Sequence, residues 1–551
     1  MSTIEDLVQI VDEYLVETYG DFAEGVDDSH PILFPKDSKI IHDSLWGTNR
    51  FYWYEMAIID SPVLQRLRDI FQVGSASYVY PGATHNRFEH SLGTAIIATK
   101  VLDSLYLRQG EKIGHIAKSL GYLPEKFMIK TRQELRLSAL LHDTGHTLFS
   151  HTSEPSHLKI NLLKKATEEV SALVAKERSS GETLSYCIAR SNFVKDIIQR
   201  NKRNIPPDKS DMYNEFMADM DNVALMILGK TKDKFTQFIA DILTSGFDSD
   251  KLDYLLRDGI SAGLPVKYDL DRYMEFVAVE EEERKIGADE EVDSIKKLYG
   301  EDVEIGDIWE EYRLRIPQSA ITSMEQIIIG KFMLFGYIYH HPKVRATDSY
   351  IDLTLRHTLE EFQTKGLNDK QLVKWLLSLT DSVFRSIPTF KNTIKNETTF
   401  SDNLAKCAYR LETRTLPREV FSVNGSAVSH VSRDNIVKFF VKFQDPDKKE
   451  EEIKSVEDKI RKELNDEEVE FWIDFPKPPS FEDVKRMVGK VPLLYIFPID
   501  RWTEAYMHYT YKMRIFTFSK YFAKLHIALS KTLPEILGLE NTVVQNLMRK
   551  R

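Results

Sequence analysis

The sequence predicts a mainly α-helical protein in which a helical core is followed by a smaller C-terminal α+β lobe. Three observations predict this fold class. From residue 60 to about residue 260, apolar residues recur at helical spacing, and Pro and Gly are sparse. A second strongly apolar helical segment follows at residues 323–355. Beyond residue 400 the chain changes to short β-branched or aromatic runs, at 421–431, 434–443 and 491–499, with a charged helical segment at 447–468.

These patterns divide the chain into three expected parts. Residues 1–37 are predicted to form an N-terminal packing helix and an extension, residues 38–400 the helical core, and residues 401–551 the α+β lobe. An acidic insertion is expected within the core at about residues 278–300, and its carboxylates are predicted to form a solvated face.

The composition excludes several classes of protein. The chain has 551 residues, 42% apolar and 29% charged, which is enough for more than one hydrophobic core. With only Cys187 and Cys407, a disulfide framework or a cysteine-rich zinc site is excluded, so a bound metal would need His, Asp and Glu ligands. The net charge of −11 makes nucleic acid an unfavourable partner. Because no apolar run is long enough for a membrane span and residues 1–20 are acidic and periodic, we expect a cytoplasmic protein without a membrane partner.

The chemical signal is densest at residues 137–154. There His142, Asp143, His146, His151 and Glu154 follow an apolar helical run. Adjacent His142 and Asp143 can direct an imidazole and a carboxylate at one cation where a helix ends. This pair supplies only half of a metal site, because a divalent ion needs about four protein ligands.

The other ligands can be sought at the ends of other core helices. His90 and Asp250 each begin an amphipathic helical segment. Together with His142 and Asp143 they would offer two imidazoles and two carboxylates, a set that suits Fe, Mn, Zn, Co or Ni and, less well, Mg.

The sequence motifs around these residues indicate a protein family more specifically than the ligand types of the residues do. Residues 81–93 (PGATHNRFEHSLG), 140–151 (LLHDTGHTLFSH) and 248–259 (DSDKLDYLLRDG) resemble the HD-domain phosphohydrolases, and among them the deoxynucleoside triphosphate triphosphohydrolases. The resemblance covers roughly residues 38 to 350. It implies a metal-dependent enzyme that cleaves a dNTP into deoxynucleoside and inorganic triphosphate. It also implies that the metal ligands are His90, His142, Asp143 and Asp250.

The resemblance implies further catalytic roles. Arg87 would contact substrate phosphate, and His146 would lie near the metal and the phosphate. His151 would donate a proton to the leaving oxygen, with Glu154 orienting its imidazole; the animal enzymes carry Asp at that place and some bacterial ones Glu.

One position departs from the animal enzymes. They carry a further catalytic histidine where this chain has Gly181, and His157 is the only nearby substitute. The absence of this histidine bears on how protons are transferred during the reaction and, to a lesser extent, on whether the protein is active.

Substrate and effector positions also carry over from the resemblance. It implies substrate contacts at Gln72 and Val73 in the sugar pocket, at Tyr254, Asp258 and Tyr339 near the sugar, and at Lys251 and Lys331 on phosphate. It implies an allosteric nucleotide pocket in which Asp60, Gln65 and Arg68 read guanine and Lys39 contacts phosphate. The residues at 60–70 are equally compatible with a helix start in which Ser61 and Pro62 are the cap and first turn. Since such pockets lie at subunit interfaces in relatives, the resemblance implies a homo-oligomer, with a tetramer favoured and GTP or a dNTP as effector.

Two alternative functions stay open. One is an HD phosphodiesterase or nuclease that acts on cyclic nucleotides or oligonucleotides. The other is a catalytically silent nucleotide-sensing scaffold, for which the absent histidine at Gly181 is the motive. A role in dNTP-pool control or antiviral defence is implied by the relatives only.

Overall fold

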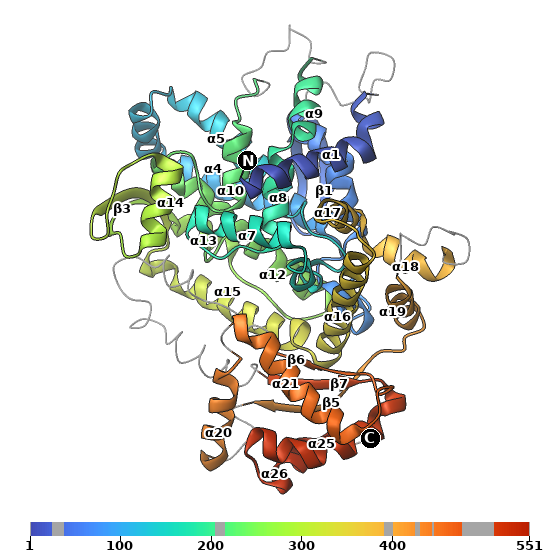
Figure 1. Ribbon diagram of the computed structural model, residues 1–551. Coiled ribbons are helices and arrows are strands. Elements are labelled where there is room, and N and C mark those ends of the chain that lie inside the picture. The colour runs from blue at the N-terminus through green and yellow to red at the C-terminus, as the bar shows by residue number, and fades with distance from the viewer. Residues whose placement is uncertain are drawn as a thin grey trace.

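The protein has a large helical body and a smaller lobe of helices and strands at its C-terminal end, drawn in orange to red in Figure 1. A computed structural model describes residues 2–24, 38–203, 215–390, 401–424, 430–443, 446–475 and 512–549. The mainly α fold class, with its helical core and α+β lobe, is confirmed. Within the described ranges, every helix is too short or too polar to cross a bilayer.

Three helices at the centre of the body determine where the candidate site lies. They are α4 (Arg87–Ser119), α5 (Pro124–Leu141) and α12 (Ser249–Ser261), and α4 packs against both others. α4 begins where the Asn86 side chain accepts a hydrogen bond from Glu89 N, and α12 begins where Asp248 accepts from Lys251 N. The starts of α4 and α12 meet the end of α5, so side chains from three distant segments face one another.

Further helices surround these three. Most of them share one large apolar core, while the last two in chain order belong to a separate apolar cluster with Leu148 and Phe149. The surrounding helices are α2 (Trp53–Ile59), α3 (Pro62–Gln65), α6 (Glu154–His157), α7 (Asn161–Val174), α8 (Ser180–Arg190), α9 (Asn192–Arg203), α10 (Met220–Ile227), α11 (Gln237–Leu243), α13 (Leu270–Phe276), α15 (Ile321–Leu334), α16 (Pro342–Thr364), α17 (Asp369–Ser378), α18 (Asp381–Phe390) and α19 (Asp402–Glu412). A π-helical turn at Phe335–Tyr339 follows α15.

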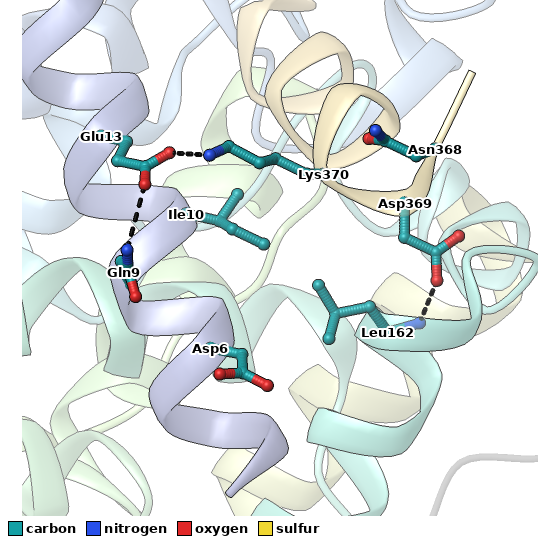
Figure 2. Close-up of a pocket in the computed structure, with 8 residues that line it drawn as sticks. All are labelled: Asp6, Gln9, Ile10, Glu13, Leu162, Asn368, Asp369 and Lys370. Carbon is teal, nitrogen blue, oxygen red and sulfur yellow. Dashed lines mark hydrogen bonds and ion pairs between the residues drawn. The ribbon is translucent and has the colours of Figure 1, made fainter. Parts of the chain in front are cut away.

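The N-terminal segment is helical, as predicted, and forms α1 (Thr3–Glu24). It packs against α7, α8, α9 and α17. A groove of about 440 Å³ lies between α1 and the first turns of α7 and α17, where Lys370 pairs with Glu13 and Asp369 accepts a hydrogen bond from Leu162 N (Figure 2). None of the residues predicted for the active site lines this groove.

Two antiparallel pairs of strands lie outside the C-terminal lobe. β1 (Ser38–Asp43) pairs with β2 (Gly47–Tyr52), and β3 (Ala278–Lys285) pairs with β4 (Ile308–Arg315). α14 (Asp289–Tyr299) lies between β3 and β4 in sequence. The segment predicted as an acidic insertion is thus part of a strand–helix–strand unit that extends to residue 315, and many of its carboxylates are exposed, as expected.

The C-terminal lobe is built on a three-stranded antiparallel sheet in the order β5-β7-β6. Its strands are β5 (Arg418–Asn424), β6 (Phe471–Asp474) and β7 (Lys512–Thr517). Its helices are α20 (His430–Val441), α21 (Pro446–Leu464), α25 (Phe522–Leu537) and α26 (Asn541–Leu547).

One strand predicted for this lobe is wrong. Residues 434–443 lie mostly in helix α20, and the described start of the run at 421–431 is extended as part of β5. The reason is that Ile436, Phe439, Phe440 and Phe443 recur at helical spacing and are all buried in the lobe's core, which outweighs the β preference of the run. The predicted strand at 491–499 lies outside the described residues, and β6 and β7 were not predicted.

Candidate metal centre and active site

The structure brings together the four residues predicted as metal ligands. His90 lies in the first turn of α4, Asp250 in the first turn of α12, and His142 and Asp143 directly follow α5. His90 Nε2 lies 3.0 Å from Asp250 Oδ1 and 3.6 Å from Asp143 Oδ2. His142 Nε2 lies 3.9 Å from Asp250 Oδ1 and 3.4 Å from Asp143 Oδ1.

This donor set fits a divalent cation. The separations of 3.0 to 3.9 Å suit ligands that share one ion through bonds of about 2.0 to 2.2 Å. Among the described residues, neither Nε2 atom has a hydrogen-bond partner, although both are buried. His142 Nδ1 lies 2.7 Å from Ala139 O, to which it donates, and this leaves Nε2 as the lone pair that faces the cluster. Imidazole and carboxylate ligands bind several divalent metals, so the identity of the ion stays open.

Charges within the cluster keep its carboxylates ionised. Burial raises the pKa of Asp143, but the Arg87 guanidinium, His142 and His146 together hold it well below its usual range. Burial lowers the pKa of His90, but the facing carboxylates of Asp250 and Asp253 outweigh burial and raise it to about 10. A cation would therefore displace a proton when it binds to His90.

A second cluster joins His146, His151 and Glu154 beside the first. Glu154 Oε2 lies 3.0 Å from His151 Nδ1, and Glu154 Oε1 lies 3.4 Å from His146 Nδ1. His146 Nε2 in turn lies 3.3 Å from Asp143 Oδ1, so the two clusters are continuous. These three side chains could also hold a metal ion by their spacing.

The two histidines of this cluster differ in charge. Burial lowers the pKa of His146 to about 4, so its imidazole is neutral. Desolvation also lowers the pKa of His151, but Glu154 raises it by more, and 69% of the His151 side chain is exposed. His151 is thus an accessible histidine whose protonated form is stabilised by Glu154, which favours a role as general acid.

Arg87 contacts the first cluster and has a nitrogen atom that can bind an anion. Its Nε donates to Ser150 Oγ at 2.7 Å and its Nη1 to Asp143, while Nη2 is buried without a hydrogen-bond partner in the part of the chain described. A buried guanidinium nitrogen without an acceptor can serve a phosphate oxygen.

Asp381, at the start of α18, is a candidate positioning residue that sequence reasoning missed. Its Oδ1 accepts a hydrogen bond from Phe149 N at 2.6 Å, and its Oδ2 accepts one from Phe71 N at 2.8 Å. Phe149 and Ser150 both have positive φ angles, of 50° and 57°, an unfavourable conformation for two successive non-glycine residues. Asp381 thereby holds the strained turn that precedes His151.

Replacing Asp381 by asparagine is expected to lower kcat by about tenfold to a hundredfold, with little change in KM. The amide group of asparagine cannot accept from both backbone N–H groups, so the turn that carries His151 loosens. Steady-state kinetics measure the effect. Asp369→Asn is a matched control, because Asp369 also accepts a backbone N–H, that of Leu162, but at the groove of Figure 2. Equal kcat values for the two variants would contradict the role of Asp381.

Gly181 accommodates Glu154. A Cβ atom at Gly181 would overlap Glu154 Oε1 and would lie 2.9 Å from His146 Cε1. With Glu154 placed as it is, a histidine at position 181 has no room, so the carboxylate fills the space that the absent side chain leaves.

His157 does not replace that histidine. It is fully buried, with Nδ1 2.9 Å from Ser180 Oγ and Nε2 3.0 Å from Thr147 Oγ1. Burial lowers the pKa of His157 to about 4, so the ring is a neutral packing residue.

His157 is expected to make the protein sensitive to acid. Its pKa of about 4 in the folded state lies below the usual value near 6.5, so the stabilisation is complete above about pH 6.5 and is lost as pH falls toward 4. Relative to a His157→Gln variant, the wild-type free energy of unfolding should fall by up to ~1.4 kcal/mol per pH unit in that window. Denaturant titrations at several pH values measure this difference. A difference that does not vary with pH would contradict the prediction.

The structure also brings together most residues predicted to surround the sugar. Asp258 accepts from Tyr339 OH and lies 2.7 Å from Nε2 of His85, which was not predicted. Tyr254 lies one helical turn before Asp258, and burial raises its pKa well above the usual value. Gln72 N donates to His85 O at 3.1 Å, and Val73 follows it.

The two predicted phosphate lysines are placed differently. Lys251 Nζ donates to Asp248 Oδ2 at 2.7 Å and to Ser245 O at 2.8 Å, so it is engaged with protein groups. Lys331 lies on α15, with Nζ 5.9 Å from the centroid of the Phe335 ring.

The residues predicted for the effector pocket lie close to one another. Lys39 Nζ is 3.9 Å from Asp60 Oδ2, and Arg68 Nε donates to Gln65 Oε1 at 2.7 Å. Burial raises the pKa of Asp60, which Lys39 and Arg68 partly offset. The structure also contains the alternative feature, a helix start with Pro62 in the first turn of α3.

The helical fold brings together a cluster of His and Asp residues that could hold a metal ion. Residues 87–226 match the family model of the HD domain. This segment is therefore similar to an HD domain, and the predicted resemblance to the HD-domain phosphohydrolases, close to the dNTP triphosphohydrolases, is confirmed.

Several curated proteins are similar to this chain. It is 33% identical over 248 residues to the deoxynucleoside triphosphate triphosphohydrolase SAMHD1 homolog of Dictyostelium discoideum, over 44% of this chain and 40% of that protein. It is 27% identical over 361 residues to deoxynucleoside triphosphate triphosphohydrolase SAMHD1 of Homo sapiens, over 63% of this chain and 50% of that protein. The chain thus spans half or less of the length of these relatives.

A solved structure shares the fold. A hypothetical protein from Aquifex aeolicus superimposes with a TM-score of 0.53 over 89% of this chain and 100% of that chain, at 18% sequence identity. This similarity concerns the fold alone.

Proposed function

We propose that the protein is a metal-dependent dNTP triphosphohydrolase that releases deoxynucleoside and inorganic triphosphate. The observation that carries the proposal is the continuity of three functional groups. A His and Asp cluster that fits a divalent ion, a buried guanidinium nitrogen on Arg87, and an accessible proton donor, His151, all adjoin Asp143 or its immediate partners. Similarity to the named dNTP triphosphohydrolases supports the choice of substrate.

Each side chain has a defined task in this reaction. A divalent ion held by His90, His142, Asp143 and Asp250 would supply Lewis acidity and make water nucleophilic near neutral pH. Arg87 would bind a phosphate oxygen through Nη2. His151 would donate its proton to the departing 5′ oxygen, and Glu154 would orient that imidazole and stabilise its charged form.

The sugar would lie against the Asp258 group. Tyr339, Tyr254 and Asp258 offer an aromatic wall and hydrogen-bonding oxygens beside the metal ligands, because Asp250, Tyr254 and Asp258 follow one face of α12. Gln72 contributes a buried Oε1 atom without a hydrogen-bond partner among the described residues, which suits a sugar hydroxyl.

The effector site, the oligomeric state and the cellular role are part of the proposal. Asp60 and Arg68 would read a guanine edge and Lys39 a phosphate, and their proximity supports one pocket. The proposed assembly is a homotetramer in the cytoplasm, and the proposed roles are dNTP-pool control and antiviral defence.

The test is product analysis. Purified protein loaded with Mn²⁺ would be incubated with each of the four dNTPs, with and without GTP, and the products separated by anion-exchange chromatography. Equimolar deoxynucleoside and triphosphate support the proposal. In parallel incubations with cyclic nucleotides and oligonucleotides, nucleoside monophosphates or shortened strands would instead indicate a phosphodiesterase. Binding of dNTPs without any product would indicate a silent scaffold.

A further inference from the structure

We propose that Trp46, in the turn of the β1–β2 hairpin, is a positioning residue for the metal ligand His90 and acts through Asp253. The inference rests on the metal centre of the proposed function, but it does not depend on the substrate. Trp46 is far in sequence from both residues, and neither it nor Asp253 was predicted for the site.

The His90 imidazole lies between two carboxylates of α12, those of Asp250 and Asp253. Asp250 Oδ1 is 3.0 Å from His90 Nε2, and Asp253 Oδ2 is 2.8 Å from His90 Nδ1. Asp253 is fully buried, and burial raises its pKa, but Arg257 and His90 lower it to about 2, so it is an ionised acceptor. A carboxylate that accepts the Nδ1 proton leaves the Nε2 lone pair directed at a metal and fixes the plane of the ring.

Asp253 itself is held from two sides. Arg257 donates to it through Nε and Nη2, each at 2.8 Å, and Trp46 donates through Nε1 to Oδ1. Space for this arrangement comes from Gly93 on α4, because a Cβ atom there would overlap Asp253 Oδ1 and Arg257 Nη2. The Asp253 carboxylate therefore has little freedom to rotate while Trp46 is in place.

Hydrogen bonds within the hairpin turn hold the Trp46 indole in place. Asp43 Oδ1 accepts from the backbone N–H groups of Leu45 and Trp46, each at 2.8 Å. Asp43 Oδ2 accepts from Arg257 Nη2 at 3.0 Å. Lys100 Nζ lies 5.5 Å from the centroid of the indole ring. The turn, the indole, Arg257 and Asp253 thus form one hydrogen-bonded unit that ends on His90.

Loss of the Trp46 N–H group should weaken metal binding without unfolding the protein. In Trp46→Phe the ring remains but Asp253 loses one of its donors, so the carboxylate and then His90 can turn. Substitutions of such supporting groups typically cost 10–100-fold in metal affinity. Titration calorimetry of metal-free protein with Mn²⁺ should show a dissociation constant raised by roughly 10-fold or more.

Trp309→Phe is the matched control. Trp309 is 2% exposed and its Nε1 donates to the Glu311 carboxylate at 3.2 Å, so the variant removes the same kind of hydrogen bond in the β3–β4 unit. Its Mn²⁺ affinity should equal that of the wild type. The visible spectrum of the Co²⁺-loaded protein should change in Trp46→Phe and not in Trp309→Phe, because that spectrum reports ligand geometry. Melting temperatures of the metal-free proteins establish that both variants are folded.

A double-mutant cycle tests the route through Asp253. If Trp46 acts through that carboxylate, Trp46→Phe should cost no further affinity in an Asp253→Asn background. Additive losses, or a Trp46→Phe variant that binds Mn²⁺ and Co²⁺ like the wild type, would overturn the inference. Failure of the wild type to bind Mn²⁺ would overturn the metal centre and this inference together. Weakened binding in Trp46→Phe, in a protein that cleaves no dNTP, would support the inference and reject only the substrate.

Discussion

Replacing Asp143 by asparagine is expected to lower kcat/KM by about 10³-fold or more and to reduce the bound metal to trace amounts. Asp143 lies at the centre of the site: it contacts Arg87, and its oxygens face His90, His142 and His146. A neutral amide offers a cation one weak oxygen ligand and leaves the buried guanidinium of Arg87 without its counter-charge. A bound metal contributes several kcal/mol to transition-state stabilisation, and each 1.36 kcal/mol is tenfold in rate.

The measurements are triphosphate release and the metal content of the purified variant. Asp241→Asn is a matched control, because Asp241 is a buried carboxylate that accepts two hydrogen bonds from Arg313, away from the site. Asp241→Asn should keep the metal content of the wild type even if its melting temperature is lower. An Asp143→Asn variant with full metal content and wild-type turnover would remove the basis of the proposed function.

Replacing His151 by alanine is expected to lower kcat by about 10²–10⁴-fold while metal affinity stays unchanged. His151 is paired with the Glu154 carboxylate, and it is not among the four residues proposed to hold the metal ion. A surface histidine of α4, His115, supplies the control variant His115→Ala, which should turn over normally. Metal loss in His151→Ala, or unchanged kcat, would show that His151 is not the general acid.

Glu154→Gln separates orientation from proton transfer. Because the Glu154 carboxylate raises the pKa of His151, its removal should lower that pKa. A protonated His151 is needed for the reaction, so activity is lost as pH rises through this pKa. The basic limb of the pH–kcat profile should therefore move to lower pH in Glu154→Gln. A profile that falls in height without moving would mean that Glu154 does not set the charge of His151.

Much of the helical body follows from local pattern. A period of 3.6 residues in apolar side chains is a property of short windows, and the helices that carry His90 and Asp250 begin where the sequence indicates, at side-chain caps from Asn86 and Asp248. The C-terminal lobe was harder to predict. The run at 434–443 has β-forming residues, yet its aromatic side chains share one helical face, and only the packing of the lobe decides between the two.

The site divides in the same way. The sequence was enough to predict which side chains carry the chemistry, because the motif places His142, Asp143, His146, His151 and Glu154 within one short segment. The residues that position these side chains could not be predicted from the sequence. Trp46 lies 207 residues from Asp253, and Asp381 lies 310 residues from Phe71 and 232 from Phe149. A lone Trp or Asp in a sequence carries no sign of such a partner, since hydrogen bonds between distant segments exist only once the helices pack. The tertiary structure alone decided how the reactive side chains are oriented, because buried polar groups must find partners wherever the fold brings them.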